Sequence, residues 1–343
     1  MSRIIPKKLI AVENNWQKEL AMAFSDPIAL LNYLQLPLAD FAQDVKARAL
    51  FPMRVPRPFA ARMLKNDAND PLFRQVFTSR QEFDSVKGYS TDPLFEQENK
   101  LPGLLHKYQS RVLLIVRGGC AVNCRYCFRR HFPYGDNHLN KSDWQETLDY
   151  IAGDKNIDEV ILSGGDPLMA KDDFLAWLSL QIEGIPHIKR LRIHTRLPVV
   201  IPSRITSEFL DWFTGSRLQA VMVLHVNHAQ EIDQSLKNAL QRLQAAGVTL
   251  LNQAVLLRGI NDSADAQVAL NETLFSAGVM PYYLHLLDKV QGASHFDVSD
   301  DAARTLMAEL IKRLPGYLVP KLVREIGGQP GKTPLDLHLH PAN

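Results

Sequence analysis

The sequence predicts an α/β fold whose parallel sheet is open or curled into a partial barrel, with a mostly helical segment in front of it. From residue 111 onward, strand-like apolar runs alternate with amphipathic, helix-like stretches. Six β/α units follow one another in this way, and strands that are joined through helices run parallel. The residues before 111 lack this alternation and carry prolines at positions 37, 52, 56 and 58.

The length and pattern of each run predict the elements in order. Apolar runs of strand length predict strands at 111–118, 158–164, 189–195, 218–226, 248–257 and 280–287. Amphipathic stretches predict helices at 142–152, 172–183, 205–213, 230–246, 264–277 and 300–313, and two shorter ones at 16–24 and 29–35. We therefore divide the chain into an N-terminal helical or irregular extension (1–105), a β/α core (106–329) and a C-terminal tail (330–343).

Composition excludes several classes of protein. The chain has 343 residues, of which 46% are hydrophobic and 22% charged, as in soluble globular proteins. Its net charge is only +2, from 39 basic and 37 acidic residues, so nothing indicates a nucleic-acid partner. No apolar run is long enough for a signal peptide or a membrane span, and we expect no membrane association. The three cysteines cannot build a disulfide framework, so we expect a cytoplasmic location.

All three cysteines lie within "GGCAVNCRYCFRR" (118–130), directly after the first predicted core strand. Three thiols are one ligand short of a closed tetrahedral metal site. A structural zinc site could take His131 as its fourth ligand, but zinc ligands usually come in pairs that are separated by a long spacer. Three buried apolar cysteines are a second alternative, which the polar residues around them disfavour. We favour an iron–sulfur cluster with one open iron position, held by Cys120, Cys124 and Cys127.

A second motif, "SGGDPL" (163–168), follows the second predicted core strand. The carboxyl ends of parallel strands form the functional edge of such sheets. Gly164 and Gly165 suit a backbone that comes close to a ligand, although an ordinary tight turn would also use them. The two motifs together resemble the radical S-adenosylmethionine superfamily. The resemblance implies a partial (β/α)6 TIM-like barrel, a [4Fe–4S] cluster and bound S-adenosylmethionine.

The C-terminal stretch "REIGGQPGKTPLDL" (324–337) imitates a phosphate-binding P-loop. A P-loop needs a glycine five residues before the glycine of GKT, where this chain has Ile326, and Pro334 blocks a following helix. We therefore reject a P-loop. A lysine in a glycine-rich loop suits a Schiff-base role, since substrate must displace it. By itself, however, this stretch is explained better by a solvated lysine at position 332.

A wider resemblance changes the interpretation of Lys332. The tail, "PGLLHKY" (102–108), "LNQAVLLRGIND" (251–262) and "PYYLHLLDKVQGASHF" (281–296) resemble the lysine 2,3-aminomutase family in the right order, over roughly residues 70 to 335. The resemblance implies that Lys332 carries pyridoxal 5′-phosphate, that Arg111 and Lys107 hold its phosphate, and that Arg129 binds the substrate carboxylate. Asp288 and Glu325 would bind the side-chain ammonium of lysine. The pocket for S-adenosylmethionine and pyridoxal phosphate would include Gly164, Gly165, Asp166, Tyr126, His225 and Gln253.

Two positions depart from the family's established lysine enzymes, which have aspartate where this chain has Glu325 and arginine where it has Lys107. Those enzymes also carry a cysteine-rich zinc extension that helps subunits associate. This chain ends soon after the lysine loop, so we expect that zinc site to be missing and leave a homo-oligomer open. These features resemble the short bacterial branch that serves β-lysylation of elongation factor P.

The resemblance implies an isomerase that converts (S)-α-lysine to (R)-β-lysine by a radical mechanism. L-lysine would be the substrate, an external electron donor would reduce the cluster, and a separate ligase would attach the product to elongation factor P. One alternative is a radical enzyme without pyridoxal phosphate that acts on a macromolecule. Another is a non-enzymatic protein that binds an iron–sulfur cluster or zinc.

Overall fold

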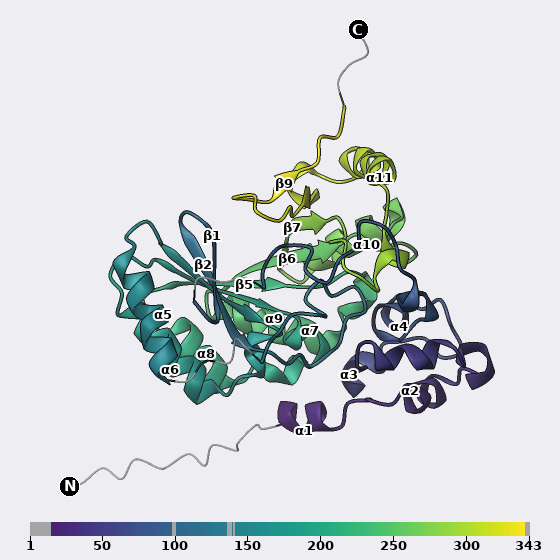
Figure 1. The fold of residues 1–343 in the computed structure, drawn as a ribbon, viewed down its shortest axis with the longest axis horizontal. Coiled ribbons are helices and arrows are strands. Elements are labelled where there is room, and N and C mark those ends of the chain that lie inside the picture. Colours follow the sequence, from purple (N-terminus) through teal and green to yellow (C-terminus); the bar gives the residue numbers. More distant parts are fainter. Residues whose placement is uncertain (1–14, 98–100, 136–138, 140, 340–343) are drawn as a thin grey trace.

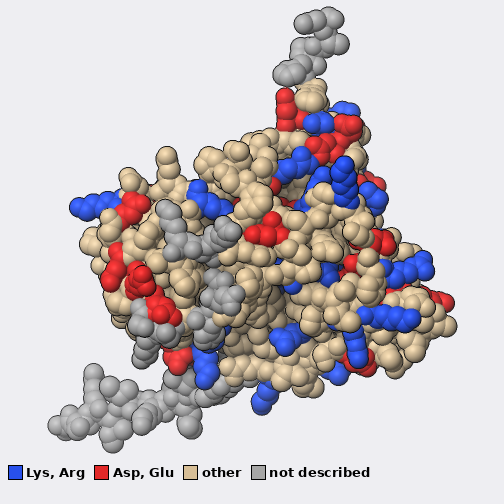
Figure 2. Space-filling view, in the orientation of Figure 1, with Lys and Arg blue, Asp and Glu red and all other residues tan. Residues whose placement is uncertain are grey.

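The computed structural model describes residues 15–97, 101–135, 139 and 141–339 of the chain. Within these residues the architecture is one mixed sheet with helices packed on its outer face and a helical N-terminal segment at one side (Figure 1). No helix in the described part is long and apolar enough to cross a membrane. Acidic and basic side chains are interspersed on the face that Figure 2 shows, in keeping with the small net charge.

The sheet has nine strands in the order β1 to β9, so each strand pairs with its neighbours in the chain. The strands from β2 to β8 run parallel, and β1 and β9 add to the two edges in antiparallel fashion. The strands are β1 (Leu104–Tyr108), β2 (Arg111–Arg117), β3 (Glu159–Gly164), β4 (Arg190–Thr195), β5 (Gln219–Leu224), β6 (Thr249–Val255), β7 (Met280–His285), β8 (Lys321–Arg324) and β9 (Thr333–Pro334).

The helices between the strands make the crossovers that a parallel sheet requires. Thr206, Asp233, Ser263 and Ser299 each begin a helix by accepting a hydrogen bond from a main-chain N–H of the first turn. The core helices are α5 (Lys141–Gly153), α6 (Asp172–Glu183), α7 (Leu197–Val200), α8 (Ser207–Thr214), α9 (Gln234–Ala245), α10 (Ala264–Ser276) and α11 (Asp300–Arg313). The N-terminal segment contributes α1 (Asn15–Ala21), α2 (Pro27–Leu34), α3 (Arg57–Ala60) and α4 (Pro71–Val76).

The predicted α/β fold is confirmed, and each of the six predicted strands corresponds to one of β2 to β7. Three strands were not predicted. β1 and β9 are antiparallel edge strands, and β8 is only four residues long, so none of them stands out as a separate apolar run. The sheet reaches across both predicted boundaries, because β1 begins before residue 106 and β9 pairs with β8 from the predicted tail.

One hydrophobic core joins the N-terminal segment to the barrel. Trp16, Phe59 and Phe73 belong to the same buried cluster as the strand residues Leu114 and Leu162. Every residue of β3 is buried, as expected for a strand that is covered on both faces. The barrel and its N-terminal extension therefore fold against each other.

Candidate active site

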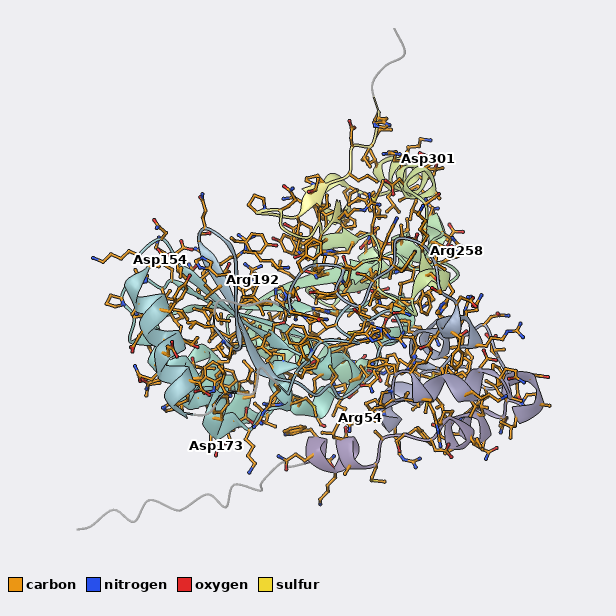
Figure 3. All side chains as sticks on the ribbon, viewed as in Figure 1. Arg54, Asp154, Asp173, Arg192, Arg258 and Asp301 are labelled. Atoms are coloured by element: carbon orange, nitrogen blue, oxygen red, sulfur yellow. The ribbon has the colours of Figure 1, made fainter. Side chains whose placement is uncertain are left out.

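The cysteine loop follows β2 and is held by the N-terminal segment. The main-chain N–H of Arg125 donates to the carbonyl oxygen of Gln75 at 2.9 Å, and that of Asn123 donates to Arg54 at 3.1 Å. The Arg54 guanidinium donates in turn to the carbonyl oxygen of Cys120 at 3.0 Å. Figure 3 shows Arg54 where the extension meets the barrel. The extension thus shapes the loop directly.

A buried carboxylate strengthens this anchor. Glu82 pairs with Arg125 and, at 2.6 Å, with Arg130, and the side chains of Glu82 and Arg125 are fully buried. Breaking a buried ion pair by removing one partner leaves a charge without compensation and is strongly destabilising. These ion pairs therefore anchor the cysteine loop to the N-terminal segment.

The three thiols are free, partly buried and close enough to affect one another. Burial, followed by the neighbouring sulfur of Cys124, raises the pKa of Cys127 to about 11. Burial also raises the pKa of Cys120 well above its usual value. A bound cation would stabilise the thiolates that this site disfavours by itself, so the donor set suits an iron–sulfur cluster.

No group of three or more His, Cys, Asp or Glu side chains in the described ranges is arranged to hold a single metal ion. The Nε2 atom of His131 lies 3.2 Å from the carbonyl oxygen of Gln291 and is engaged there. The zinc alternative with His131 as fourth ligand has no support in this geometry.

Arg196, at the end of β4, directs a positive charge at the loop. Its Nη1 atom donates to Cys124 Sγ at 2.7 Å, and its Nη2 atom donates to Gln75 Oε1 at 2.7 Å and to Glu231 Oε2 at 3.0 Å. The hydroxyl group of Tyr126 contacts the same guanidinium. Arg196 therefore ties the cysteine loop to β4, to the N-terminal segment and to Glu231.

The two glycines after β3 allow the motif to pack on the cysteine loop. A Cβ atom at Gly165 would lie 2.7 Å from the carbonyl oxygens of both Gly118 and Gly119. Gly164 has a φ of +128°, and a Cβ atom there would lie 2.4 Å from the Arg117 carbonyl oxygen. No side chain fits at either position without moving main-chain atoms. The close approach that the motif predicts is thus to the cysteine loop itself.

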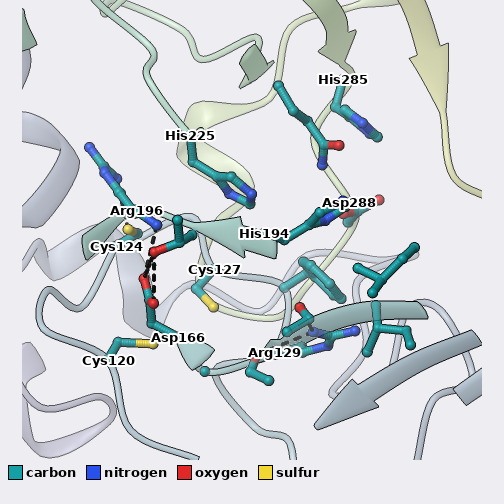
Figure 4. Close-up of a pocket in the computed structure, with 18 of the residues that line it drawn as sticks. Cys120, Cys124, Cys127, Arg129, Asp166, His194, Arg196, His225, His285 and Asp288 are labelled. Atoms are coloured by element: carbon teal, nitrogen blue, oxygen red, sulfur yellow. Dashed lines mark hydrogen bonds between the residues drawn. The ribbon is translucent and has the colours of Figure 1, made fainter. Parts of the chain in front are cut away.

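Asp166 ties the ends of β3 and β4 together. Its carboxylate accepts hydrogen bonds from Thr195 Oγ1 at 2.8 Å and from the main-chain N–H groups of Leu168, Arg196 and Leu197 at 2.9 to 3.0 Å (Figure 4). These protein donors occupy the carboxylate, so Asp166 shapes the cavity wall from within the protein.

A chain of alternating charges crosses the site. Glu96 lies between Arg129 (Nε to Oε2, 2.7 Å) and Lys107 (Nζ to Oε1, 2.8 Å). Glu325 then lies between Lys107 at 3.5 Å and Lys332 at 2.6 Å. Burial alone would raise the pKa of Glu325, but the two lysines outweigh it and lower the pKa. The predicted carboxylate-binding arginine and cofactor lysine are therefore connected through two carboxylates.

Asp288 is the exception in this charged region. Its Oδ1 atom is shielded from solvent and has no hydrogen-bond partner in the described part of the chain. Burial and the Glu325 carboxylate raise the pKa of Asp288 to about 7. The Asp288 carboxyl group thus lacks a hydrogen-bonded cation, and the ammonium of a ligand would provide one.

Three histidines with unpaired nitrogens face the same space. The Nε2 atoms of His194, His225 and His285 are shielded from solvent, and none has a hydrogen-bond partner among the described residues. Burial lowers the pKa of His225 to about 4 and lowers those of the other two well below their usual value. Neutral imidazoles with free nitrogens in an apolar wall are suited to bind a polar ligand.

The remaining predicted cofactor residues lie on the strands and edges around these histidines. The Arg111 guanidinium stacks over the Tyr108 ring at 3.7 Å, and Gln253 on β6 is in register with Tyr283 on β7. The Lys332 ammonium lies 5.9 Å from the centre of the Tyr283 ring. Aromatic faces next to cations provide a surface on which a flat ring can lie.

One cavity, which extends from the carboxyl ends of the strands to Arg111 at the start of β2, joins all of these groups. Figure 4 shows Cys120 and Cys124 toward one side of it, and Asp288 and His285 toward the other. Every site residue that the sequence predicts lines this cavity: Lys107, Arg111, Cys120, Cys124, Tyr126, Cys127, Arg129, Gly164, Gly165, Asp166, His225, Gln253, Asp288, Glu325 and Lys332.

Among the charged side chains and histidines that line this cavity, sequence reasoning missed five: Glu96, Arg192, His194, Arg196 and His285. His194 and Arg196 lie at the end of a predicted strand and could have been found by that position alone. His285 lies within another predicted strand and is the last residue of β7. Glu96 comes from a segment without a recognisable pattern, and only the fold brings it to the site.

Comparison with known proteins agrees with this arrangement. The model of the radical SAM superfamily matches residues 114–269. L-lysine 2,3-aminomutase of Escherichia coli (strain K12) is 57% identical over 326 residues, which cover 95% of each chain. The Haemophilus influenzae enzyme of the same name is 57% identical over 333 residues, covering 96% of this chain and 98% of the relative.

More distant relatives carry the same name. L-lysine 2,3-aminomutase of Clostridium subterminale is 32% identical over 327 residues, covering 94% of this chain and 78% of that one. A crystal structure of a radical SAM methyltransferase from Sphaerobacter thermophilus has a TM-score of 0.47 and 16% identity, over 66% of this chain and 72% of that chain, which is too low to carry an argument.

Proposed function

The chain belongs to the lysine 2,3-aminomutase family of radical SAM enzymes, and on that premise we propose that it converts (S)-α-lysine to (R)-β-lysine. The residues that line the cavity are the main support for this proposal. Three clustered thiols, a lysine in a loop and charged groups for both ends of an amino acid line one space. The 57% identity to two L-lysine 2,3-aminomutases over nearly the whole chain supports it.

Cys120, Cys124 and Cys127 would hold a [4Fe–4S] cluster, which leaves one iron position for S-adenosylmethionine. Bound together, these two cofactors supply a 5′-deoxyadenosyl radical. The unlinked thiols and the fixed loop fit this role. Tyr126 and the glycine pair 164–165 border the same part of the cavity and would form the wall for the nucleotide.

Lys332 would carry pyridoxal 5′-phosphate, with Arg111 and Lys107 on its phosphate. When bound there, this cofactor supplies a conjugated ring that stabilises a neighbouring radical. The free Nε2 atom of His225 and the amide of Gln253 would contact the ring or its substituents. The apolar and aromatic lining keeps water away from these groups.

The charged groups select lysine among amino acids. Arg129 would bind the α-carboxylate, a task that suits its planar guanidinium. Asp288 and Glu325 would bind the side-chain ammonium at the other end. Glu325 pairs with the Lys332 ammonium in this structure, and the ammonium of the substrate is a cation of the same kind. An uncharged side chain would leave these carboxylates unpaired, which is costly.

The experiment is anaerobic reconstitution of the full chain with iron, sulfide and pyridoxal phosphate, followed by incubation with S-adenosylmethionine, a reductant and L-lysine. Resolution of the products on a chiral column should show (R)-β-lysine. Lys332→Ala is the matched control, expected to retain iron but to form no product. A cluster without a pyridoxal phosphate absorption band would support a macromolecule-modifying radical enzyme instead, and no cluster at all would support a simple metal binder.

The biological setting is a further part of the proposal. We place the reaction in the cytoplasm, because three free thiols require a reducing compartment. An external donor would supply the electron, and a separate ligase would attach the product to elongation factor P. The protein would act alone or as a homo-oligomer. Elongation factor P purified from cells that lack this chain should carry no β-lysine if this setting is right.

A further inference from the structure

Glu96 brings a carboxylate into the cavity from a segment outside the predicted core. It precedes β1, and its residue is only 4% exposed. One carboxylate oxygen lies 2.8 Å from Lys107 Nζ and the other lies 2.7 Å from Arg129 Nε. A single side chain therefore bridges two cations that the proposed function assigns to different ligands.

The segment that carries Glu96 is a turn with its own hydrogen bonds. Asp92 accepts hydrogen bonds from the main-chain N–H groups of Glu96 at 3.0 Å and Gln97 at 3.1 Å. Phe95 has a φ of +53°, which is uncommon for a residue with a side chain. Its ring packs against Gly327 of the lysine loop, where a Cβ atom would lie 2.3 Å from it. The turn is thus held by its own capping residue, and its exposed Phe95 ring touches the loop that bears Lys332.

Glu96 helps to orient the guanidinium group of Arg129. Arg129 Nε donates to Glu96, and Nη1 donates to the carbonyl oxygen of Gly164 at 3.2 Å and to Ser163 Oγ at 3.4 Å. Among the bonds between described residues, Nη2 makes none. Two of the three guanidinium nitrogens therefore bond to the protein, and the third is left for an incoming carboxylate.

We propose, on the basis of the proposed function, that Glu96 is a positioning residue. It aligns Arg129 for the substrate carboxylate and Lys107 for the cofactor phosphate. It stays in place when these ligands bind. Displacement would leave a buried carboxylate without a partner, which is strongly unfavourable. One residue therefore couples substrate recognition to cofactor recognition.

The test compares Glu96→Gln with the wild-type protein, both as reconstituted full chains. Three dissociation constants are measured: one for pyridoxal phosphate and, at saturating pyridoxal phosphate, one each for lysine and lysinamide. Lysinamide lacks the carboxylate that Arg129 would bind. Loss of charge-assisted hydrogen bonds should weaken both pyridoxal phosphate and lysine by about tenfold or more, and lysinamide much less. The preference for lysine over lysinamide should therefore fall.

Matched variants separate positioning from a general loss of structure. Asp172→Asn removes another buried carboxylate, paired with Arg204 at 2.8 Å outside the cavity, and should lower stability without changing any of the three constants. Arg129→Met should weaken lysine and leave pyridoxal phosphate at the wild-type value. A loss of both affinities in Glu96→Gln would then not be explained by the loss of Arg129 alone.

The inference is overturned if Glu96→Gln leaves either affinity at the wild-type value, or if lysine binds more tightly, as it would to a site freed of a competing carboxylate. Should that variant fail to fold, Glu96→Asp carries the test. It keeps the charge but its carboxylate is one methylene shorter in reach toward both cations, so wild-type values for both ligands would also overturn the inference. If the wild-type protein neither binds pyridoxal phosphate nor prefers lysine to lysinamide, the proposed function fails instead.

Discussion

The preference for a cationic side chain is expected to depend on pH through Asp288. Burial and the neighbouring Glu325 carboxylate raise the pKa of Asp288 to about 7, from an ordinary value of 3.8. Below pH 7 the carboxyl group is therefore mostly protonated in the substrate-free protein and cannot pair with an ammonium. A lysine side chain that binds beside it must first displace this proton.

The size of the effect follows from that pKa. A proton that must leave on binding weakens the affinity by about tenfold for each pH unit below the pKa, and has no effect above it. Between pH 8 and pH 6, the affinity for lysine relative to norleucine should therefore fall by about tenfold. Norleucine lacks the side-chain ammonium but shares the α-amino and carboxylate groups, so the ratio removes their own pH dependence.

Titration calorimetry on the reconstituted protein, repeated between pH 5.5 and pH 8.5, measures this ratio. Asp288→Asn has no carboxyl group to titrate and should give a ratio that is low at every pH. A wild-type ratio that does not change with pH would refute the reasoning. So would an asparagine variant whose ratio keeps the wild-type slope, because the titrating group would then lie elsewhere.

Three further predictions concern the cofactor residues. Cys124→Ala should lose the iron–sulfur absorption band and its iron content while its far-UV circular dichroism stays unchanged, and normal iron content would contradict the ligand assignment. Borohydride reduction should fix pyridoxal phosphate to Lys332, as peptide mapping would show, and a label on another lysine would place the cofactor elsewhere. Gly165→Ala would put a Cβ atom 2.7 Å from the carbonyl oxygens of Gly118 and Gly119, so it should reduce iron content although all three thiols remain. Its free energy of unfolding should fall by about 1–3 kcal/mol, and wild-type iron content and stability would show that the loop can move aside.

Features that depend on local order in the chain could be predicted. Most strands from β2 to β7 are largely apolar runs, as expected for strands that are covered by helices, whereas β4 (RLRIHT) alternates apolar with polar residues. The cysteine loop and the glycine pair follow two such strands, and parallel strands bring their carboxyl ends to one edge. The sequence therefore determined the sheet, the thiols and the edge at which they lie.

What the polar side chains bond to was decided only by the tertiary structure. Asp166 looks like a ligand-binding residue in its motif, yet main-chain donors from its own loop and from the residues that follow β4 surround its carboxylate. The N-terminal extension shows no pattern that indicates the cysteine loop, yet Glu82 holds two of the loop's arginines.

Glu96 illustrates the physical reason. Its contacts with Lys107 and Arg129 join positions 11 and 33 residues away in the chain. Hydrophobic periodicity reports which face of an element is buried, whereas an ion pair forms between whichever charges the packed elements bring together. The sequence by itself determined which chemical groups the protein has. The packing of segments that are distant in the chain decided which of these groups form ion pairs and which, like Asp288 Oδ1, have no hydrogen-bond partner among the described residues.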